Sequence, residues 1–181
     1  MIKVYDDFLP KNEFLYLENY IFSEKFPWYY GSVLGEGPDR LCDELDDMQF
    51  INMMYLDFMP QGREFHILEP IIKSPKLRIT SLFRIKANMN PRTQEIIKHG
   101  FHLDVPYNET TAIYYVNSND GYTEFEDGTQ IESVENRLLV FDSQISHTGS
   151  TCTNARVRCV INFNYYTSKH ITPEDGHTKG S

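Results

Sequence analysis

The sequence has 181 residues, 17 basic and 26 acidic side chains, a formal net charge of −9 and a pI near 5.1. The length suits one domain with a substantial core, and the acidic balance makes nucleic acid an unlikely partner, because nonspecific affinity for it needs clustered Lys and Arg. Three cysteines without metal-finger spacing argue against a disulfide framework or a zinc ribbon.

The N-terminal segment has no signal-peptide core, and no apolar run reaches the length of a membrane span. We therefore expect a cytoplasmic protein that has no membrane partner. Abundant Tyr and Phe favour a β-rich fold, since aromatic side chains pack well on half-buried strands.

The first half of the chain predicts a few short elements. In order, we expect a strand at 2–4, a helix with an apolar stripe at 14–22, an extended aromatic segment at 26–30, a strand at 50–58 and a helix at 65–72. Between them, the loop 35–47 carries four acidic residues within five positions. Such a run could attract a basic target, but it is more typical of solvated surface.

A strand is predicted over 76–88, where Arg84, Lys86 and Asn88 share one face because side chains alternate along a strand. This polar face could line a cavity or face water. The sequence Asn90-Pro91 predicts the end of the strand and the start of a loop that runs to Lys98.

The second half predicts many short strands separated by turns. They lie at 110–117, 122–125, 129–133, 137–142 and 156–166. Turns at this spacing favour an antiparallel sandwich or barrel. The polar tail after Thr167 is expected to fray.

A candidate metal site stands out around His102, Asp104 and His147. Residues two apart on a strand point to the same side, and two imidazoles with one carboxylate leave open positions on an ion. With 6 histidines and 26 acidic residues in 181, about one His-x-Asp/Glu triplet is expected by chance. The prediction therefore depends on the whole series of features that follows the triplet.

In this order, the features resemble those of the iron(II)- and 2-oxoglutarate-dependent oxygenases, most closely the prolyl 4-hydroxylase-like branch. The matching segments are His102-Leu103-Asp104, Thr111–Asn117, Gly121–Phe125, Arg137–Phe141, His147–Gly149 and Arg158–Phe163. The resemblance covers roughly residues 80 to 166.

The resemblance implies a mostly β fold with supporting α-helices, the double-stranded β-helix or cupin-like jelly roll. One oxygenase domain would span 1–181, with supporting helices and strands in 1–75 and the β-helix core in 76–166. His102, Asp104 and His147 would hold iron(II), with no catalytic residue beyond these ligands. 2-Oxoglutarate and O₂ would be cosubstrates, with ascorbate as a further reductant.

The implied reaction is hydroxylation of an unactivated C–H bond with release of succinate and CO₂. Its substrate would be a peptide or protein, with a prolyl residue as the first choice, or a small molecule such as a free amino acid. The distal carboxylate of 2-oxoglutarate needs a cation, and a guanidinium offers a planar bidentate match. Arg158 fits the family's spacing better than Arg156, whose role would then be at the surface.

Other cosubstrate-binding residues are less closely matched. Tyr115 matches the family's tyrosine that binds the same carboxylate, and Tyr114 is its displaced alternative. The tyrosine upstream of the metal motif has no counterpart, so Lys86 or Asn88 would take that place. Asn164 stands where the family has a bulky aromatic residue.

Two other functions are compatible with the same three metal ligands. A His₂Asp set with water also suits a zinc hydrolase, although a hydrolase needs no buried anchor for a dicarboxylate. A cupin-like metal-dependent binding module without turnover is the non-enzymatic alternative. The remaining histidines have no matched partners, so solvent-exposed or packing roles are expected for His66, His99, His170 and His177.

Overall fold

The computed structural model describes residues 2–31, 48–104 and 109–167. The predicted acidic loop at 43–47, the turn at 106–108 and the polar tail after Thr167, with His170 and His177, lie outside these residues. The two cysteines in the described part, Cys152 and Cys159, are free thiols, and both are buried.

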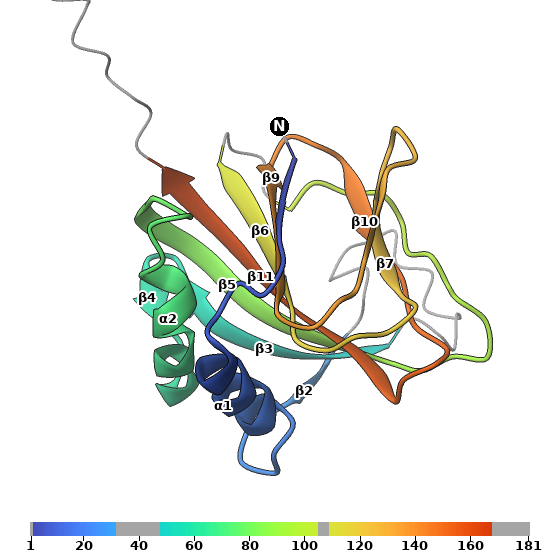
Figure 1. Cartoon of the computed structure of the whole chain (residues 1–181), viewed down its shortest axis with the longest axis horizontal. Helices are drawn as coiled ribbons and strands as arrows, with labels where there is room; N and C mark the ends of the chain where they lie inside the picture. The colour runs from blue at the N-terminus through green and yellow to red at the C-terminus, as the bar shows by residue number, and fades with distance from the viewer. Residues whose placement is uncertain (1, 32–47, 105–108, 168–181) are drawn as a thin grey trace, which may run out of the picture.

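Two antiparallel sheets form the body of the molecule (Figure 1). The larger sheet has the order β1 (Lys3–Tyr5), β9 (Arg137–Asp142), β6 (Thr110–Tyr115), β11 (Val157–Thr167), β5 (Ile79–Pro91), β3 (Gln49–Leu56) and β2 (Tyr29–Gly31), and β4 (Met59–Pro60) pairs with β3. The smaller sheet has the order β10 (His147–Gly149), β7 (Tyr122–Phe125) and β8 (Gln130–Glu132). The predicted short antiparallel strands are therefore present, and four strands of the larger sheet (β1, β2, β3 and β4) come from the first 75 residues.

Helices pack on the side of the larger sheet that faces away from β7 and β10 (Figure 1). Helix α1 (Lys11–Ile21) buries Phe14, Leu17 and Ile21, the apolar stripe predicted from their spacing. The second predicted helix is wrong as a single element, because a 3₁₀ turn (Arg63–Leu68) precedes the four-residue α2 (Glu69–Ile72). Pro70 lies in the first turn of α2, where its missing N–H costs no hydrogen bond. None of the helices in the described ranges is long and apolar enough to cross a bilayer.

Alternation along the central strands separates two cores. Ala112 and Tyr114 of β6 face the helices, whereas Ile113 and Tyr115 face the smaller sheet. The second core also contains Phe125, Leu139, Phe141 and Val160. The space between the sheets is thus filled at one end by apolar side chains, and the polar residues of β5 and β11 line the remainder.

Strand β5 begins three residues later than predicted, at Ile79, and extends three residues further, to Pro91. The predicted end at Asn88 is wrong, because Asn90 pairs with Arg158 and Pro91 with Val157 in the register between β5 and β11. Proline is tolerated at a strand end, where its lack of an N–H interrupts no further pairing. The extension adds Asn90 to the polar face of β5.

Asn136 ties the start of α1 to the larger sheet. It is 4% exposed and has a φ of 58°, a left-handed conformation that asparagine tolerates better than most residues. Its Oδ1 accepts hydrogen bonds from the Leu9 backbone N–H at 2.9 Å and the Tyr114 hydroxyl at 2.8 Å, and its Nδ2 donates to the Leu9 carbonyl at 2.9 Å. One side chain thus satisfies three buried polar groups.

We expect Asn136→Ala to lower the free energy of unfolding by about 3 kcal/mol, at roughly 1 kcal/mol for each lost hydrogen bond. Urea denaturation of the two proteins measures the difference. Asn136→Asp, which keeps the acceptor oxygens, should be less destabilising. A loss for Asn136→Ala of well under about 1 kcal/mol would contradict the structural role, since surface substitutions stay within about 0.5 kcal/mol.

Candidate metal centre

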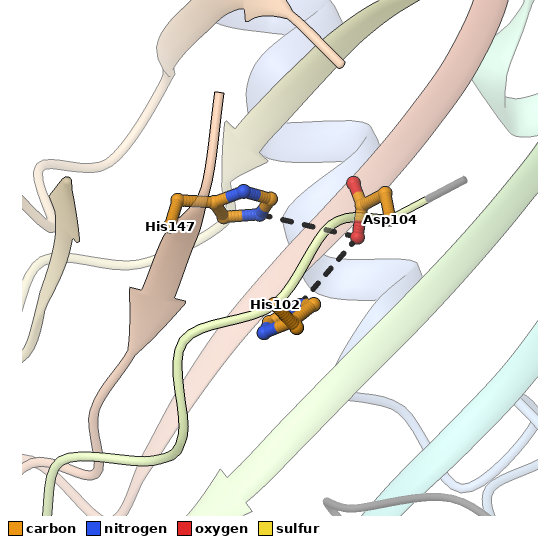
Figure 2. A group of neighbouring side chains, drawn as sticks. All are labelled: His102, Asp104 and His147. Carbon is orange, nitrogen blue, oxygen red and sulfur yellow. Dashed lines mark ion pairs between the residues drawn. The ribbon is translucent and has the colours of Figure 1, made fainter. Parts of the chain in front are cut away.

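His102, Asp104 and His147 point toward one another, with His147 on β10 and the other two on the segment that precedes residue 105 (Figure 2). The Nε2 atoms of His102 and His147 lie 3.6 and 3.9 Å from Asp104 Oδ1, and the ligand atoms of all three residues fall within 4.8 Å of one another. Such a cluster has room for one ion. The structure thus brings together the three residues that the sequence predicts as ligands.

Backbone pairing explains how residues 45 positions apart converge. His102 and His147 form an antiparallel bridge in which the His102 N–H donates to the His147 carbonyl at 2.9 Å and the His147 N–H donates to the His102 carbonyl at 3.1 Å. The segment around His102, to which we applied strand alternation, is not a regular strand, because this single bridge is its only ladder pairing within the described residues. His102 and Asp104 nevertheless reach one site, since their ligand atoms lie within 4.8 Å of each other, although exposure does not alternate here because Phe101, His102 and Leu103 are all exposed.

Each imidazole is oriented by its own backbone neighbourhood. Nδ1 of His102 lies 3.1 Å from the Gly100 carbonyl oxygen, and Nδ1 of His147 lies 3.2 Å from that of Ile145. A carbonyl oxygen only accepts, so each Nδ1 carries the proton and each Nε2 keeps a lone pair for a metal. Burial lowers the pKa of His147, which favours the neutral form that binds metal.

The Asp104 carboxylate is held by two further side chains. Nδ2 of Asn164 donates to Oδ2 at 3.2 Å, and the Arg84 guanidinium lies 3.4 Å from Oδ1. Burial alone would raise the pKa of Asp104, but contact with His102 and the charges of His147 and Arg84 outweigh it and lower the pKa. The carboxylate therefore stays ionised, as a ligand must be.

The contacts of Asn164 and Arg84 with Asp104 and with each other are the parts of this site that the sequence did not predict. Arg84 Nε donates to Asn164 Oδ1 at 2.9 Å, and the two residues are direct partners in the register between β5 and β11. The sequence did contain one indication of this role, since Asn164 stands where the resembled family has a bulky aromatic residue. The partners of Asn164 could not be inferred from this difference, because they depend on the register between β5 and β11, which the sequence does not specify.

A cavity of about 390 Å³ opens beside the three ligands. Its polar wall comes from alternate residues of β5 and β11, whose register pairs Arg158 with Asn90, Val160 with Asn88 and Asn162 with Lys86. A volume of this size suits a small ligand. The interpretation of the polar face of β5 as a cavity wall, rather than a solvent-facing surface, is the one that the structure supports.

Arg158 lies deep in the cavity wall and is 3% exposed. Its Nε donates to Ser133 Oγ at 2.9 Å and its Nη2 to Thr123 Oγ1 at 3.2 Å, while the guanidinium lies 5.8 Å from the centre of the Tyr115 ring. No carboxylate pairs with it among the described residues, and burial lowers its pKa. Because arginine stays charged even there, this guanidinium is suited to an anionic ligand.

Alternation along β6 separates Tyr114 from Tyr115, and Arg156 differs from Arg158 because it precedes β11 and is exposed. Tyr115 is buried on the Arg158 side, and its hydroxyl donates at 2.8 Å to the same Thr123 oxygen that Arg158 contacts. Tyr114 faces the helices, bonded to Asn136, and Arg156 is exposed outside the cavity. The structure thus groups Arg158 with Tyr115 and separates Arg156 and Tyr114 from the cavity. Thr123, which links the pair, was not singled out in the sequence.

The less closely matched residues Lys86 and Asn88 both line the cavity. Asn88 Nδ2 donates to the Lys86 carbonyl at 3.3 Å. His99 also lines the cavity, although it does not belong to the three-residue cluster. His66 is exposed beside Glu69, in keeping with the solvent role expected of it.

The donor set fits iron(II). Two imidazole nitrogens and one carboxylate oxygen lie within 4.8 Å of one another, the donor set of a facial triad with open positions. All three ligands line the cavity, where a cosubstrate has space to approach. The same three ligands also fit zinc, which accepts nitrogen and oxygen donors.

No protein-family model and no curated protein matches the sequence. Solved structures do match its fold. A Trichoplax adhaerens prolyl hydroxylase in complex with a hypoxia inducible factor oxygen degradation domain peptide fragment has a TM-score of 0.60 and 16% identity, over 91% of this chain and 83% of that one. A viral collagen prolyl hydroxylase from Paramecium Bursaria Chlorella virus-1, in its 2-oxoglutarate complex, has a TM-score of 0.57 and 15% identity, over 93% and 96%.

A Pseudomonas putida prolyl-4-hydroxylase has a TM-score of 0.55 and 15% identity, over 91% of this chain and 92% of that one. These similarities confirm the predicted jelly roll. The chain therefore has the fold of the iron(II)- and 2-oxoglutarate-dependent oxygenases, and its His102, Asp104 and His147 cluster is consistent with that family.

Proposed function

We propose that the chain is an iron(II)- and 2-oxoglutarate-dependent dioxygenase that hydroxylates an unactivated C–H bond, with release of succinate and CO₂. His102, Asp104 and His147 hold the iron, and Arg158 binds the distal carboxylate of 2-oxoglutarate. The observation that carries the proposal is one cavity that contains both the three ligands and a buried guanidinium without a carboxylate partner.

Bound iron with 2-oxoglutarate and O₂ supplies the oxidising chemistry, and the protein positions the reactants. The Nδ1 contacts of His102 and His147 fix both rings with Nε2 toward the metal. Arg84 and Asn164 hold the Asp104 carboxylate. Arg158, fixed by Ser133 and Thr123, holds the cosubstrate at the other end of the cavity.

A peptide or protein is the substrate that we propose first, with a prolyl residue as the target. Support comes from the structural neighbours, which are named as prolyl hydroxylases, one of them in complex with a peptide fragment. The exposed Phe101 and Leu103 on either side of His102 line the cavity and offer apolar contacts to such a chain. A free amino acid or another small molecule also fits the cavity volume.

The two alternatives explain less of the cavity. A zinc hydrolase uses the three ligands but has no need for a buried cation held by Ser133, Thr123 and the Tyr115 ring. A cupin-like binding module without turnover accounts for the ligands and for an anion on Arg158. Such a module would bind the metal and the anion without forming a product, so an assay for succinate distinguishes it from the enzyme.

We expect the protein, given iron(II), 2-oxoglutarate and O₂ with a panel of proline-containing peptides and metabolites, to form succinate and to add one oxygen atom to a member of the panel. Chromatography measures succinate, and mass spectrometry measures the gain. Omission of iron or chelation of the metal should abolish both, because the proposed reaction takes place at the iron. No succinate above the metal-free background would contradict the proposal.

A further inference from the structure

Lys86 is a cation in the cavity wall that the proposed reaction leaves unassigned. Its side chain is partly buried and lines the cavity, yet it has no ion pair or hydrogen bond within the described part of the chain. Burial and the charge of Arg84 lower its pKa, while the charge of Asp104 raises it. A desolvated ammonium without a partner is costly, and an anionic ligand would offset that cost.

Asn162 lies directly opposite Lys86 in the register between β5 and β11. It also lines the cavity, and its Oδ1 is buried without a hydrogen-bond partner. Directly opposed residues place their Cβ atoms about 5 Å apart. The pair therefore presents a cation and a hydrogen-bond acceptor side by side, and neither group has a partner within the described residues.

Charge balance indicates that this ligand is not the cosubstrate alone. Among the described residues that line the cavity, the cations are Arg84, Lys86 and Arg158, and the only carboxylate is Asp104. The two charges of iron(II) balance the two carboxylates of 2-oxoglutarate, and Arg84 is paired with Asp104. The cavity thus keeps a net positive charge when metal and cosubstrate are bound, in a protein whose overall charge is −9.

We propose that Lys86 and Asn162 form a subsite for a carboxylate with a neighbouring N–H group, so that the substrate is an amino acid, either free or at the C-terminus of a peptide. Lys86 pairs with the carboxylate, and Asn162 Oδ1 accepts the N–H. The inference rests on the proposed oxygenase function. It narrows the substrate class from peptides and metabolites in general to molecules that carry this carboxylate.

The test uses protein loaded with Mn(II), which prefers similar ligands and supports no turnover, together with 2-oxoglutarate. Calorimetry compares the free amino acids, their N-acetyl derivatives and the matching carboxamides. We expect at least one acid to bind at least tenfold more tightly than its carboxamide, because a charge-assisted hydrogen bond is about twice as strong as a neutral one. Preference for the N-acetyl form would indicate a peptide C-terminus, and preference for the free form a metabolite.

Variants assign the preference to the two side chains. Lys86→Met should abolish the discrimination between acid and carboxamide, and Lys86→Arg should retain it. Asn162→Ala should abolish the discrimination between an amino acid and the matching acid that lacks nitrogen. Lys25→Met, at an exposed lysine, is the matched control and should behave like the unaltered protein.

Several outcomes would overturn the subsite. They are the absence of binding by any acid in the panel, equal binding of acids and carboxamides, and an unchanged preference in Lys86→Met. A loss of 2-oxoglutarate binding in Lys86→Met would assign Lys86 to the cosubstrate instead. Failure of the unaltered protein to bind 2-oxoglutarate with metal would refute the proposed function itself, and this is measured before any amino acid is added.

Discussion

His102→Ala will weaken the binding of iron(II), or of Mn(II) as its redox-inert substitute, by at least about a hundredfold. That is the upper end of the loss seen when only a supporting partner of a ligand is removed, and His102 is proposed as a ligand itself. Its Nε2 lies 3.6 Å from Asp104 Oδ1, so its removal leaves one imidazole and one carboxylate. Calorimetric titration of the metal-free protein measures the affinity.

The folded state should tolerate this substitution. The His102 side chain is 51% exposed, and the bridge to His147 is made by backbone atoms that alanine also has. A melting temperature close to that of the unaltered protein would therefore accompany the metal defect. His66→Ala, at an exposed histidine outside the cluster, is the control. Unchanged metal affinity in His102→Ala would remove the metal site from this position.

Arg158→Ala is expected to weaken 2-oxoglutarate binding by about thirtyfold or more while metal affinity changes little. Truncation of one member of a buried, hydrogen-bonded charge pair costs about 2–5 kcal/mol. Arg158 is 3% exposed and has no carboxylate partner of its own among the described residues, so the bound dicarboxylate would be its main charged contact. Titration of 2-oxoglutarate into the Mn(II) protein gives the affinity.

Two further variants separate anchoring from folding. Arg158→Lys keeps a charge but loses the planar fork, so it should bind 2-oxoglutarate with intermediate affinity. Arg156→Ala removes an exposed guanidinium two residues away and should have no effect on cosubstrate binding. If Arg156→Ala shows the defect and Arg158→Ala does not, the anchor has been assigned to the wrong arginine.

Much of the site follows from alternation along strands, which the sequence reveals. The spacing of Arg84, Lys86 and Asn88 predicted a shared face, and the structure places all three in the cavity wall. The same rule separates Tyr114 from Tyr115, because neighbouring residues on β6 face different cores. Side-chain direction within one strand is a local property, so it can be predicted locally.

Contacts between strands could not be predicted in this way. The hydrogen bonds of Asn164 to Asp104 and Arg84 depend on the register of β11 against β5, which has a shift between Asn164 and Tyr165. The pairing of Lys86 with Asn162 has the same origin. The structural role of Asn136 was not predicted, because it depends on hydrogen bonds to Leu9, which lies more than a hundred residues away in the sequence.

The backbone conformation was predicted less well where contacts between distant segments override the local sequence preference. Asn90 and Pro91 have loop-forming sequences, yet pairing with β11 keeps both in β5. The His102 segment was treated as extended, and it makes a single bridge to His147. In both cases a partner far along the chain determines the backbone conformation.

The most direct measurement of the central claim is the visible spectrum of the protein after anaerobic addition of iron(II) and then 2-oxoglutarate. A chelated 2-oxoglutarate on iron(II) gives a visible charge-transfer band, and we predict that the band appears only when both are present and disappears when O₂ is admitted with formation of succinate. Absence of the band at saturating iron and 2-oxoglutarate would contradict a shared site for metal and cosubstrate in the cavity beside His102, Asp104 and His147.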